Sequence, residues 1–184
     1  MRRLFVAPVA CWFALSAGSA WGQTAADLPN LAAEAAQWES GRNVEPLQKI
    51  KQLVRDSLGK PEVQREIEAA MVKLLAPGST VEGRRFACQI LAVVGTDASL
   101  PALAELLKSD ETVGVACLAL SNRRSPKVNE TLRNALAASR GVVRLELLSA
   151  VGNHQDVEAV PALAALARDA DAATADAAIL ALGK

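Results

Sequence analysis

Aromatic residues are scarce in this 184-residue chain: tyrosine is absent, and phenylalanine and tryptophan together make up 3% of it. Residues that favour strands, whether aromatic or β-branched, are comparatively few, so the composition argues against a fold built on sheets. The chain is nevertheless 51% hydrophobic, and alanine and leucine supply that content. Because alanine and leucine are strong helix formers, the composition favours packed helices within one domain-sized core.

Residue types that carry catalysis or bind metals are also scarce. The chain has one histidine and three cysteines, and it contains no CxxC pair, Gly-rich phosphate loop, nucleophile elbow or shared pair of carboxylates. His154 is expected in an exposed turn without a role, since a general base needs a nucleophile and an orienting acid within reach. The sequence therefore predicts no catalytic residue, no cofactor, no metal and no small-molecule substrate.

The first 22 residues have the pattern of a signal peptide. Arg2 and Arg3 precede an apolar stretch over residues 4–17, and small residues follow, with cleavage expected after Ala20 or Gly22. An uncleaved anchor helix is the alternative, because the apolar run approaches the ~20 residues that a membrane span needs. Pro8 within the run disfavours that alternative. We therefore expect a periplasmic or extracellular protein with no membrane span after cleavage.

Cleavage would remove two arginines and leave 18 basic against 20 acidic residues, a net charge near −2. A nucleic-acid partner would require a basic face, so none is expected.

The strongest pattern is an internal repeat with a period of about 29 to 31 residues. Clear copies span residues 85–107 and 142–167, a degenerate copy spans 115–136, and a fourth begins at residue 172. Each copy is expected to form a helix, a turn and a second helix, because apolar residues recur at helical spacing. One such hairpin cannot bury both of its apolar faces, so successive copies must stack. We therefore predict an all-α fold, an α-solenoid of stacked helical hairpins.

Turn and capping residues indicate where the helices of each copy end. Gly95 and Gly152 are expected in the left-handed position just past the first helix. Asp97 and Asp156 are expected to cap the second helix.

The two cysteines that remain after cleavage, Cys88 and Cys117, lie 29 residues apart and thus at equivalent positions of successive first helices. Packed helices lie about 8–10 Å apart, whereas a disulfide needs Cα atoms within about 7 Å. We therefore expect two packed free thiols.

The repeat resembles the short HEAT-like repeat of bacterial proteins, whose consensus is similar to A-x-x-L-G followed by A-V-P-A-L-x-x-L-L. Residues 87–107 and, most closely, 150–167 carry the resemblance, whereas the copy at 115–136 lacks both the glycine and the A-V-P-A-L string. The resemblance implies a HEAT-like superhelix, and the arrangement as a whole is similar to exported bacterial HEAT-repeat proteins. Members of this superfamily mostly bind proteins, and a few are lyases that act on bilin chromophores.

The resemblance divides the chain into three parts: the signal peptide (1–22), irregular N-terminal helical hairpins that form a cap (23–81), and HEAT-like repeats (82–184) of which the last is incomplete. Pro61 is expected to open a helix of the cap, and Ser79 with Glu82 has the spacing of a capping box. Trp38, the one tryptophan left after cleavage at Gly22, is either a binding anchor or a plug of this cap, and we favour the plug.

The last copy has no second helix to cover it. Ile179, Leu180 and Leu182 are therefore expected to be exposed, where a proper cap would be polar. We expect the chain to be a truncated copy or a fragment of something longer.

In HEAT-repeat proteins the second helices usually line the concave face, where partners dock, so the resemblance implies a binding surface there. The candidate partner-binding residues are the polar residues of those helices: Glu105, Lys108, Arg133, Asn134 and Arg168. Two basic pairs, at residues 84–85 and 123–124, form either a strip for an acidic partner or ordinary packed arginines, which we favour.

These observations predict an exported scaffold that binds a protein partner through its concave helical face without catalysis. One alternative is the truncated scaffold portion of a larger secreted enzyme. Another is an enzyme in its own right, such as a chromophore lyase, against which export, the single histidine and the packed cysteines all weigh.

Overall fold

The computed structural model describes residues 27–184, and this part of the chain is entirely helical, with ten α-helices, two short 3-10 helices and no strand. The all-α prediction is confirmed. Within the same residues, no helix combines the length and the apolar character that a membrane crossing requires. The predicted signal peptide, residues 1–22, lies outside the described residues.

The helices lie in two layers, which we call the even layer and the odd layer. The even layer consists of α2 (Leu28–Ala36), α4 (Pro61–Leu74), α6 (Leu100–Leu106), α8 (Pro126–Ala138) and α10 (Val160–Leu166). The odd layer consists of α3 (Glu45–Asp56), α5 (Val81–Val94), α7 (Val113–Leu120), α9 (Gly141–His154) and α11 (Ala172–Leu182). The 3-10 helices η1 (Asp97–Ser99) and η2 (Val157–Ala159) lead into α6 and α10.

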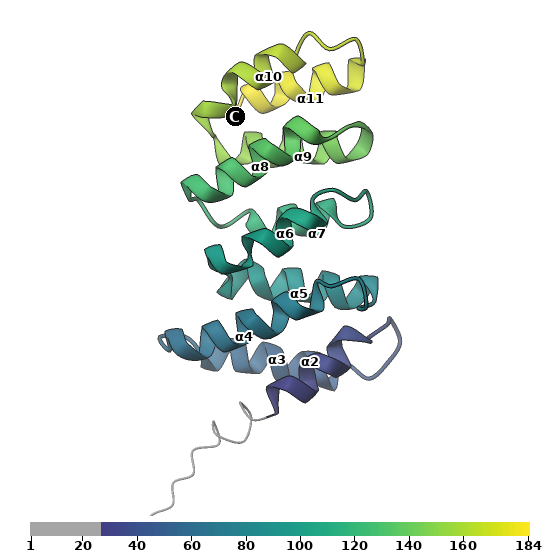
Figure 1. Cartoon of the computed structure of the whole chain (residues 1–184), viewed down its shortest axis with the longest axis vertical. Coiled ribbons are helices and arrows are strands. Elements are labelled where there is room, and N and C mark those ends of the chain that lie inside the picture. The colour runs from purple at the N-terminus through teal and green to yellow at the C-terminus, as the bar shows by residue number, and fades with distance from the viewer. Residues whose placement is uncertain (1–26) are drawn as a thin grey trace, which may run out of the picture.

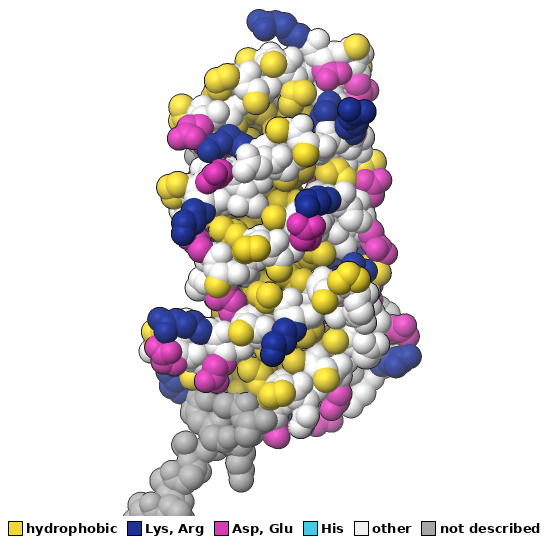
Figure 2. Space-filling model, viewed as in Figure 1, with side chains coloured by type: hydrophobic (Ala, Val, Ile, Leu, Met, Phe, Trp, Pro, Cys, Tyr) yellow, Lys and Arg dark blue, Asp and Glu magenta, His cyan; other side chains and the backbone are white. Residues whose placement is uncertain are grey.

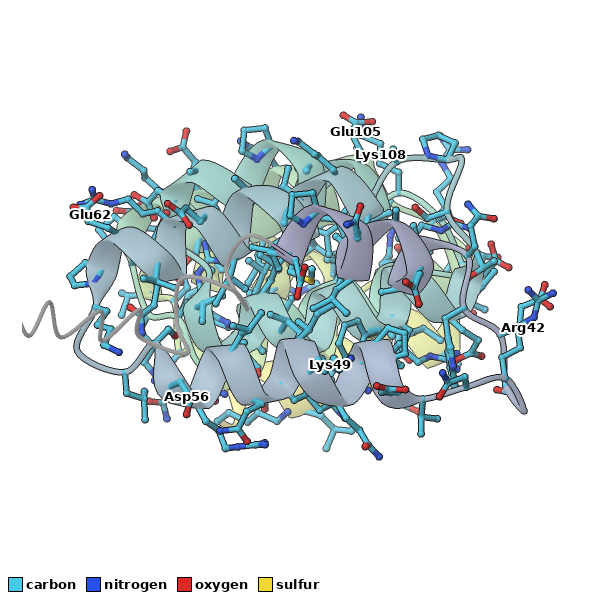
Figure 3. All side chains as sticks on the ribbon, turned by 90° about the horizontal axis from the view of Figure 1, so that it is seen from below. Arg42, Lys49, Asp56, Glu62, Glu105 and Lys108 are labelled. Atoms are coloured by element: carbon cyan, nitrogen blue, oxygen red, sulfur yellow. The ribbon has the colours of Figure 1, made fainter. Side chains whose placement is uncertain are left out.

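Successive hairpins are piled along the long axis of the molecule (Figure 1). In the odd layer each helix contacts the next, from α3 through α5, α7 and α9 to α11, and in the even layer α2 contacts α4 and α6 contacts α8. Figure 3 looks along this axis and shows the layers on opposite sides, with Lys49 of α3 on one side and Glu105 and Lys108 on the other.

Leucine, isoleucine and alanine fill the space between the layers. Ile50, Ile67, Leu91, Leu120 and Leu147 are fully enclosed, and each such side chain stabilises the fold by roughly 1.5–3 kcal/mol relative to its exposed state. Helices α3, α4, α5 and α8 are amphipathic towards this core, which is why their apolar residues recur with the helical period, whereas α7 and α11 are apolar on most of their surface.

The junction between α2 and α5 depends on Thr80. Its hydroxyl oxygen accepts a hydrogen bond from the Gly83 amide at 3.0 Å, so Thr80 is the N-cap of α5 and the predicted cap is displaced by one residue from Ser79. The same hydroxyl donates to the carbonyl oxygen of Trp38 at 2.6 Å, and the Thr80 amide donates to that of Ala36 at 2.9 Å. One side chain thus starts α5 and ties it to the end of α2.

The prediction that Gly95 and Gly152 adopt left-handed conformations was wrong. Gly95 follows α5 with φ −65° and ψ 141°, and a Cβ there would collide with the carbonyl oxygen of Leu91. Gly152 lies inside α9, where a Cβ would meet the Cα of Ala181 at 2.8 Å. Both glycines provide room for a close approach, and the left-handed residue past α9 is Gln155, with φ 52°.

Asp156 was correctly predicted as an N-cap, whereas Asp97 was not. Asp156 accepts a hydrogen bond from the Glu158 amide at 3.2 Å and caps η2 as expected. At η1 the cap is Thr96, which accepts from the Ala98 amide at 3.2 Å, and Asp97 is already within the helix.

The outer face of α11 is apolar and open, as the sequence predicts. Ile179, Leu180 and Leu182 are 55%, 69% and 40% exposed. The opposite face of α11 packs on α9 through Ala178 and Ala181, both of which are buried.

Candidate partner-binding surface

The even layer carries grooves between neighbouring helices. One lies between α2 and α4 with a volume of about 540 Å³, and another lies between α6 and α8 with a volume of about 640 Å³. Figure 2 shows this face of the molecule, with hydrophobic side chains in bands between the helices and charged side chains scattered among them. The face is therefore a series of shallow apolar strips with polar borders.

The groove between α6 and α8, which we call the α6–α8 groove, has an apolar floor and a polar border. Its floor is formed by Ala104, Leu107, Ala135, Ala138 and Val143, and its border by Lys108, Asp110, Thr131, Asn134, Ser139 and Arg140. The border carries both signs of charge, which suits a partner that presents main-chain polar groups and mixed charges.

Helical spacing places these walls opposite one another. On α8, residues 131, 134, 135 and 138 recur at intervals of three and four and share one face, while 104, 107 and 108 do the same on the α6 side. The alanines at 135 and 138 are too short to close the space, so the groove stays open. Ser125 caps α8 by accepting a hydrogen bond from the Val128 amide at 3.3 Å, which sets the start of this face.

Glu105 and Lys108 form an exposed ion pair beside the groove. The Lys108 Nζ lies 2.7 and 2.8 Å from the two carboxylate oxygens of Glu105, one turn away on the same helical surface. Figure 3 shows both side chains directed outward from the even layer. Because exposed pairs of this kind stabilise a protein by only about 0–1 kcal/mol, a partner carboxylate can replace Glu105 at Lys108 at little cost.

Arg133 is occupied within the molecule. Its guanidinium donates to the Asp156 carboxylate and lies 2.8 Å from that of Glu158, so it links α8 to η2. The side chain is 25% exposed, and the hydrogen bond to Asp156 raises the pKa of Arg133 above its ordinary value. Arg133 therefore holds neighbouring hairpins together on the side of α8 away from the groove.

The five predicted partner-binding residues therefore do not share one surface. Lys108 and Asn134 line the same groove, and Glu105 stands beside it. Arg133 faces η2, and Arg168 is an exposed residue beyond α10, with no ion pair to any residue between 27 and 184.

Four polar groove residues were missed by the sequence reasoning: Asp110, Thr131, Ser139 and Arg140. Thr131 could have been found, because it lies three residues before Asn134 on the same helix face. The other three lie in the connections after α6 and α8, and only the contact between hairpins brings those connections to the groove.

Cys88 on α5 and Cys117 on α7 are free thiols, as expected. Cys88 is buried and Cys117 is partly buried. Burial raises the pKa of both thiols to about 12, so the reactive thiolate is almost unpopulated at neutral pH.

The prediction of an exposed loop histidine was wrong. His154 is the last residue of α9 and is only 6% exposed. Its Nδ1 lies 3.1 Å from the amide oxygen of Asn129 on α8. Burial, reinforced by the nearby positive charge of Arg124, lowers the pKa of His154. The error arose because α9 continues for two residues beyond Gly152, which carries the imidazole into the core.

The basic pairs are held individually by neighbouring groups. Arg123 donates to the Ser99 hydroxyl at 3.0 Å and to the Thr96 carbonyl oxygen at 2.7 Å. Arg84 lies 3.6 Å from the Glu111 carboxylate and is largely covered. These contacts favour packed arginines over a continuous basic strip.

Comparison with protein-family models, curated proteins and solved structures gives no match to the chain. The resemblance to HEAT repeats therefore remains a prediction from the sequence.

Proposed function

We propose that the chain is an exported scaffold, a HEAT-like α-solenoid that binds a protein partner through its even layer without performing catalysis. The stacking of hairpins with a period of about 30 residues supports the solenoid assignment. The α6–α8 groove is the observation that carries the binding function, because it is an open, apolar-floored site on helices that repeat proteins use for recognition.

The groove suits a short segment of a folded or unfolded partner. Its volume of about 640 Å³ leaves room for a few small side chains of a partner. Small apolar side chains of the partner would pack on Ala135 and Ala138, while Lys108, Asp110 and Arg140 would pair with groups at the edge. Binding of this kind depends on shape and charge complementarity, and it requires no residue with perturbed acid–base chemistry.

Export is part of the proposal and rests on the pattern of residues 1–22. Fractionation of cells of the source organism, followed by intact-mass measurement, tests it. The expected result is a chain in the cell envelope or medium that begins after Ala20 or Gly22. Recovery of the full-length chain from the cytoplasm would contradict it.

A pair of neighbouring alanines tests the binding site. Ala138 lines the α6–α8 groove, whereas Ala137 is exposed on the same helix and lies outside it. Ala138→Trp is expected to fill the groove and block partner binding, while Ala137→Trp leaves binding intact. Thermal unfolding of both variants verifies that each remains folded.

The binding itself is measured by photo-crosslinking in cell-envelope extract. A photoreactive side chain at Asn134 is expected to give one dominant adduct, which Ala138→Trp abolishes and Ala137→Trp preserves. The matched control carries the same group at Asp56, which Figure 3 shows on the opposite layer. Equal adducts at positions 134 and 56, or none at either, would refute the proposed binding surface.

A further inference from the structure

The odd layer contains a second site of different composition. Trp38 and Phe86 are the only aromatic side chains among residues 27–184, and both line one pocket of about 390 Å³. Trp38 follows the end of α2, Phe86 belongs to α5, and α3 provides the third wall. In a chain so poor in aromatics, their convergence on one pocket distinguishes it from the alanine-lined grooves of the even layer.

The frame of this pocket is rigid. The Thr80 hydroxyl holds the carbonyl oxygen of Trp38 at 2.6 Å while it caps α5. Gly83 permits the approach, since a Cβ there would stand 2.7 and 2.8 Å from the carbonyl oxygens of Ala35 and Ala36. Trp38 is therefore fixed against the first turn of α5, one turn before the ring of Phe86.

The pocket carries a surplus of positive charge. Lys51 Nζ lies 5.8 Å from the centroid of the Phe86 ring, and no carboxylate between residues 27 and 184 forms an ion pair with it. Arg85 is paired with Glu82 at 2.8 Å. Two cations and one carboxylate thus line the pocket, and Lys51 is the cation that a ligand can neutralise.

The position of Lys51 favours a negatively charged ligand over a cation. Two aromatic rings could in principle surround a cation, but the ammonium group of Lys51 already occupies the Phe86 side and would repel it. Contacts between an exposed ammonium group and a ring are weak, so Lys51 can turn from Phe86 to an incoming carboxylate.

We infer that this pocket binds an acidic segment of a partner protein, in which a carboxylate is flanked by an apolar side chain. Lys51 holds the carboxylate beside the Arg85–Glu82 pair, and Trp38 and the half-exposed Val44 contact the apolar group. The site lies on the opposite layer from the α6–α8 groove and does not depend on the function proposed for that groove.

Trp38 provides the measurement. In the full chain with Trp12→Phe and Trp21→Phe, it is the only tryptophan, and its fluorescence reports on the pocket directly. The probes are blocked tetrapeptides, acetyl-Leu-Glu-Glu-Leu-amide and its matched acetyl-Leu-Gln-Gln-Leu-amide, together with 3-phenylpropionate as a small carboxylate. The acidic peptide is expected to give a saturable change with a Kd below about 1 mM, and the glutamine peptide no saturation.

Two lysines on the same helix make a matched pair of variants. Lys51→Gln is expected to raise the Kd of the acidic peptide roughly tenfold, which corresponds to about 1.4 kcal/mol of binding free energy. Lys49→Gln is expected to leave its Kd unchanged, because Lys49 is paired with Glu45 outside the pocket. Both lysines are exposed, and circular dichroism verifies that both variants keep their helices.

Four results would overturn the inference. The first is equal binding of the acidic and glutamine peptides, and the second is equal weakening by Lys51→Gln and Lys49→Gln. The third is binding of 3-phenylpropionate without binding of the acidic peptide, which would make the ligand a small carboxylic acid. Absence of any response to the acidic peptide at millimolar concentration would overturn it as well.

Discussion

Gly152 controls how closely α11 can pack on α9. A methyl group at this position would stand 2.8 Å from the Cα and 3.0 Å from the Cβ of Ala181, whereas carbon atoms in favourable contact are about 3.5–4.0 Å apart. Gly152→Ala therefore forces α11 outward by about 1 Å, because the obstructing atoms belong to the backbone and cannot rotate away.

Two opposing effects determine the size of the change. Alanine is favoured over glycine within a helix by about 1 kcal/mol, while overpacking of a tight contact costs typically 1–3 kcal/mol. Because backbone atoms are involved, we expect the second effect to dominate and the free energy of unfolding to fall by about 1–2 kcal/mol. In a chain of this size the corresponding loss in Tm is about 2–8 °C.

Gly114→Ala is the matched control. Gly114 is also a helical glycine of the odd layer, but a Cβ there would meet nothing nearer than the Glu146 Oε2 at 4.0 Å. This variant is expected to gain up to about 1 kcal/mol from helix propensity alone. Comparison of the two variants separates the close contact from the general effect of replacing glycine.

Chemical denaturation gives the free energies, and amide hydrogen exchange localises the effect. Gly152→Ala should raise exchange in α11 above that in α5 and α7, because the contact that it disrupts joins α11 to α9. A Gly152→Ala variant as stable as Gly114→Ala, with unchanged exchange in α11, would refute the packing derived for this contact.

Three further predictions concern the links between hairpins. His154 has a lowered pKa in the folded chain, so the unfolded chain binds the proton more readily. The free energy of unfolding is therefore highest above the ordinary pKa of 6.5 and falls as the pH drops below it. Urea titrations at several pH values should show this decline, and His154→Gln should remove it. Thr80→Val removes the cap of α5 and the hydrogen bond to Trp38, and should lower the free energy of unfolding by about 1–3 kcal/mol. An unchanged free energy of unfolding in denaturant titrations would contradict this role. Arg133→Met should lower Tm by unpairing the buried Asp156 carboxylate, whereas the exposed Arg168→Met should not; equal midpoints for the two would show that the link is dispensable.

Helix content and some helix boundaries could be predicted from the sequence, because they depend on local spacing and local hydrogen bonds. Pro61 begins α4 since its fixed φ and missing amide suit a first helical turn. Asp156 caps η2 through an amide two residues away.

The candidate site was predicted only in part, because helix spacing does not give the direction of a long side chain. Arg133 and Asn134 are adjacent in α8, yet Asn134 borders the groove while Arg133 reaches the acidic pair at η2. That choice depends on where η2 lies in the next hairpin. The convergence of Trp38 and Phe86 likewise depends on the contact between α2 and α5, 44 residues apart at the Thr80–Ala36 bond.

The sequence by itself determined that the described part of the chain is helical and where helices such as α4 begin. These properties follow from the 3.6-residue period, propensity and capping, which act over a few residues. Only the tertiary structure decided why Gly152 is a glycine, that His154 is buried, and which polar side chains face a groove. Each of those depends on atoms of a neighbouring hairpin about 30 residues away, whose distance no local pattern encodes.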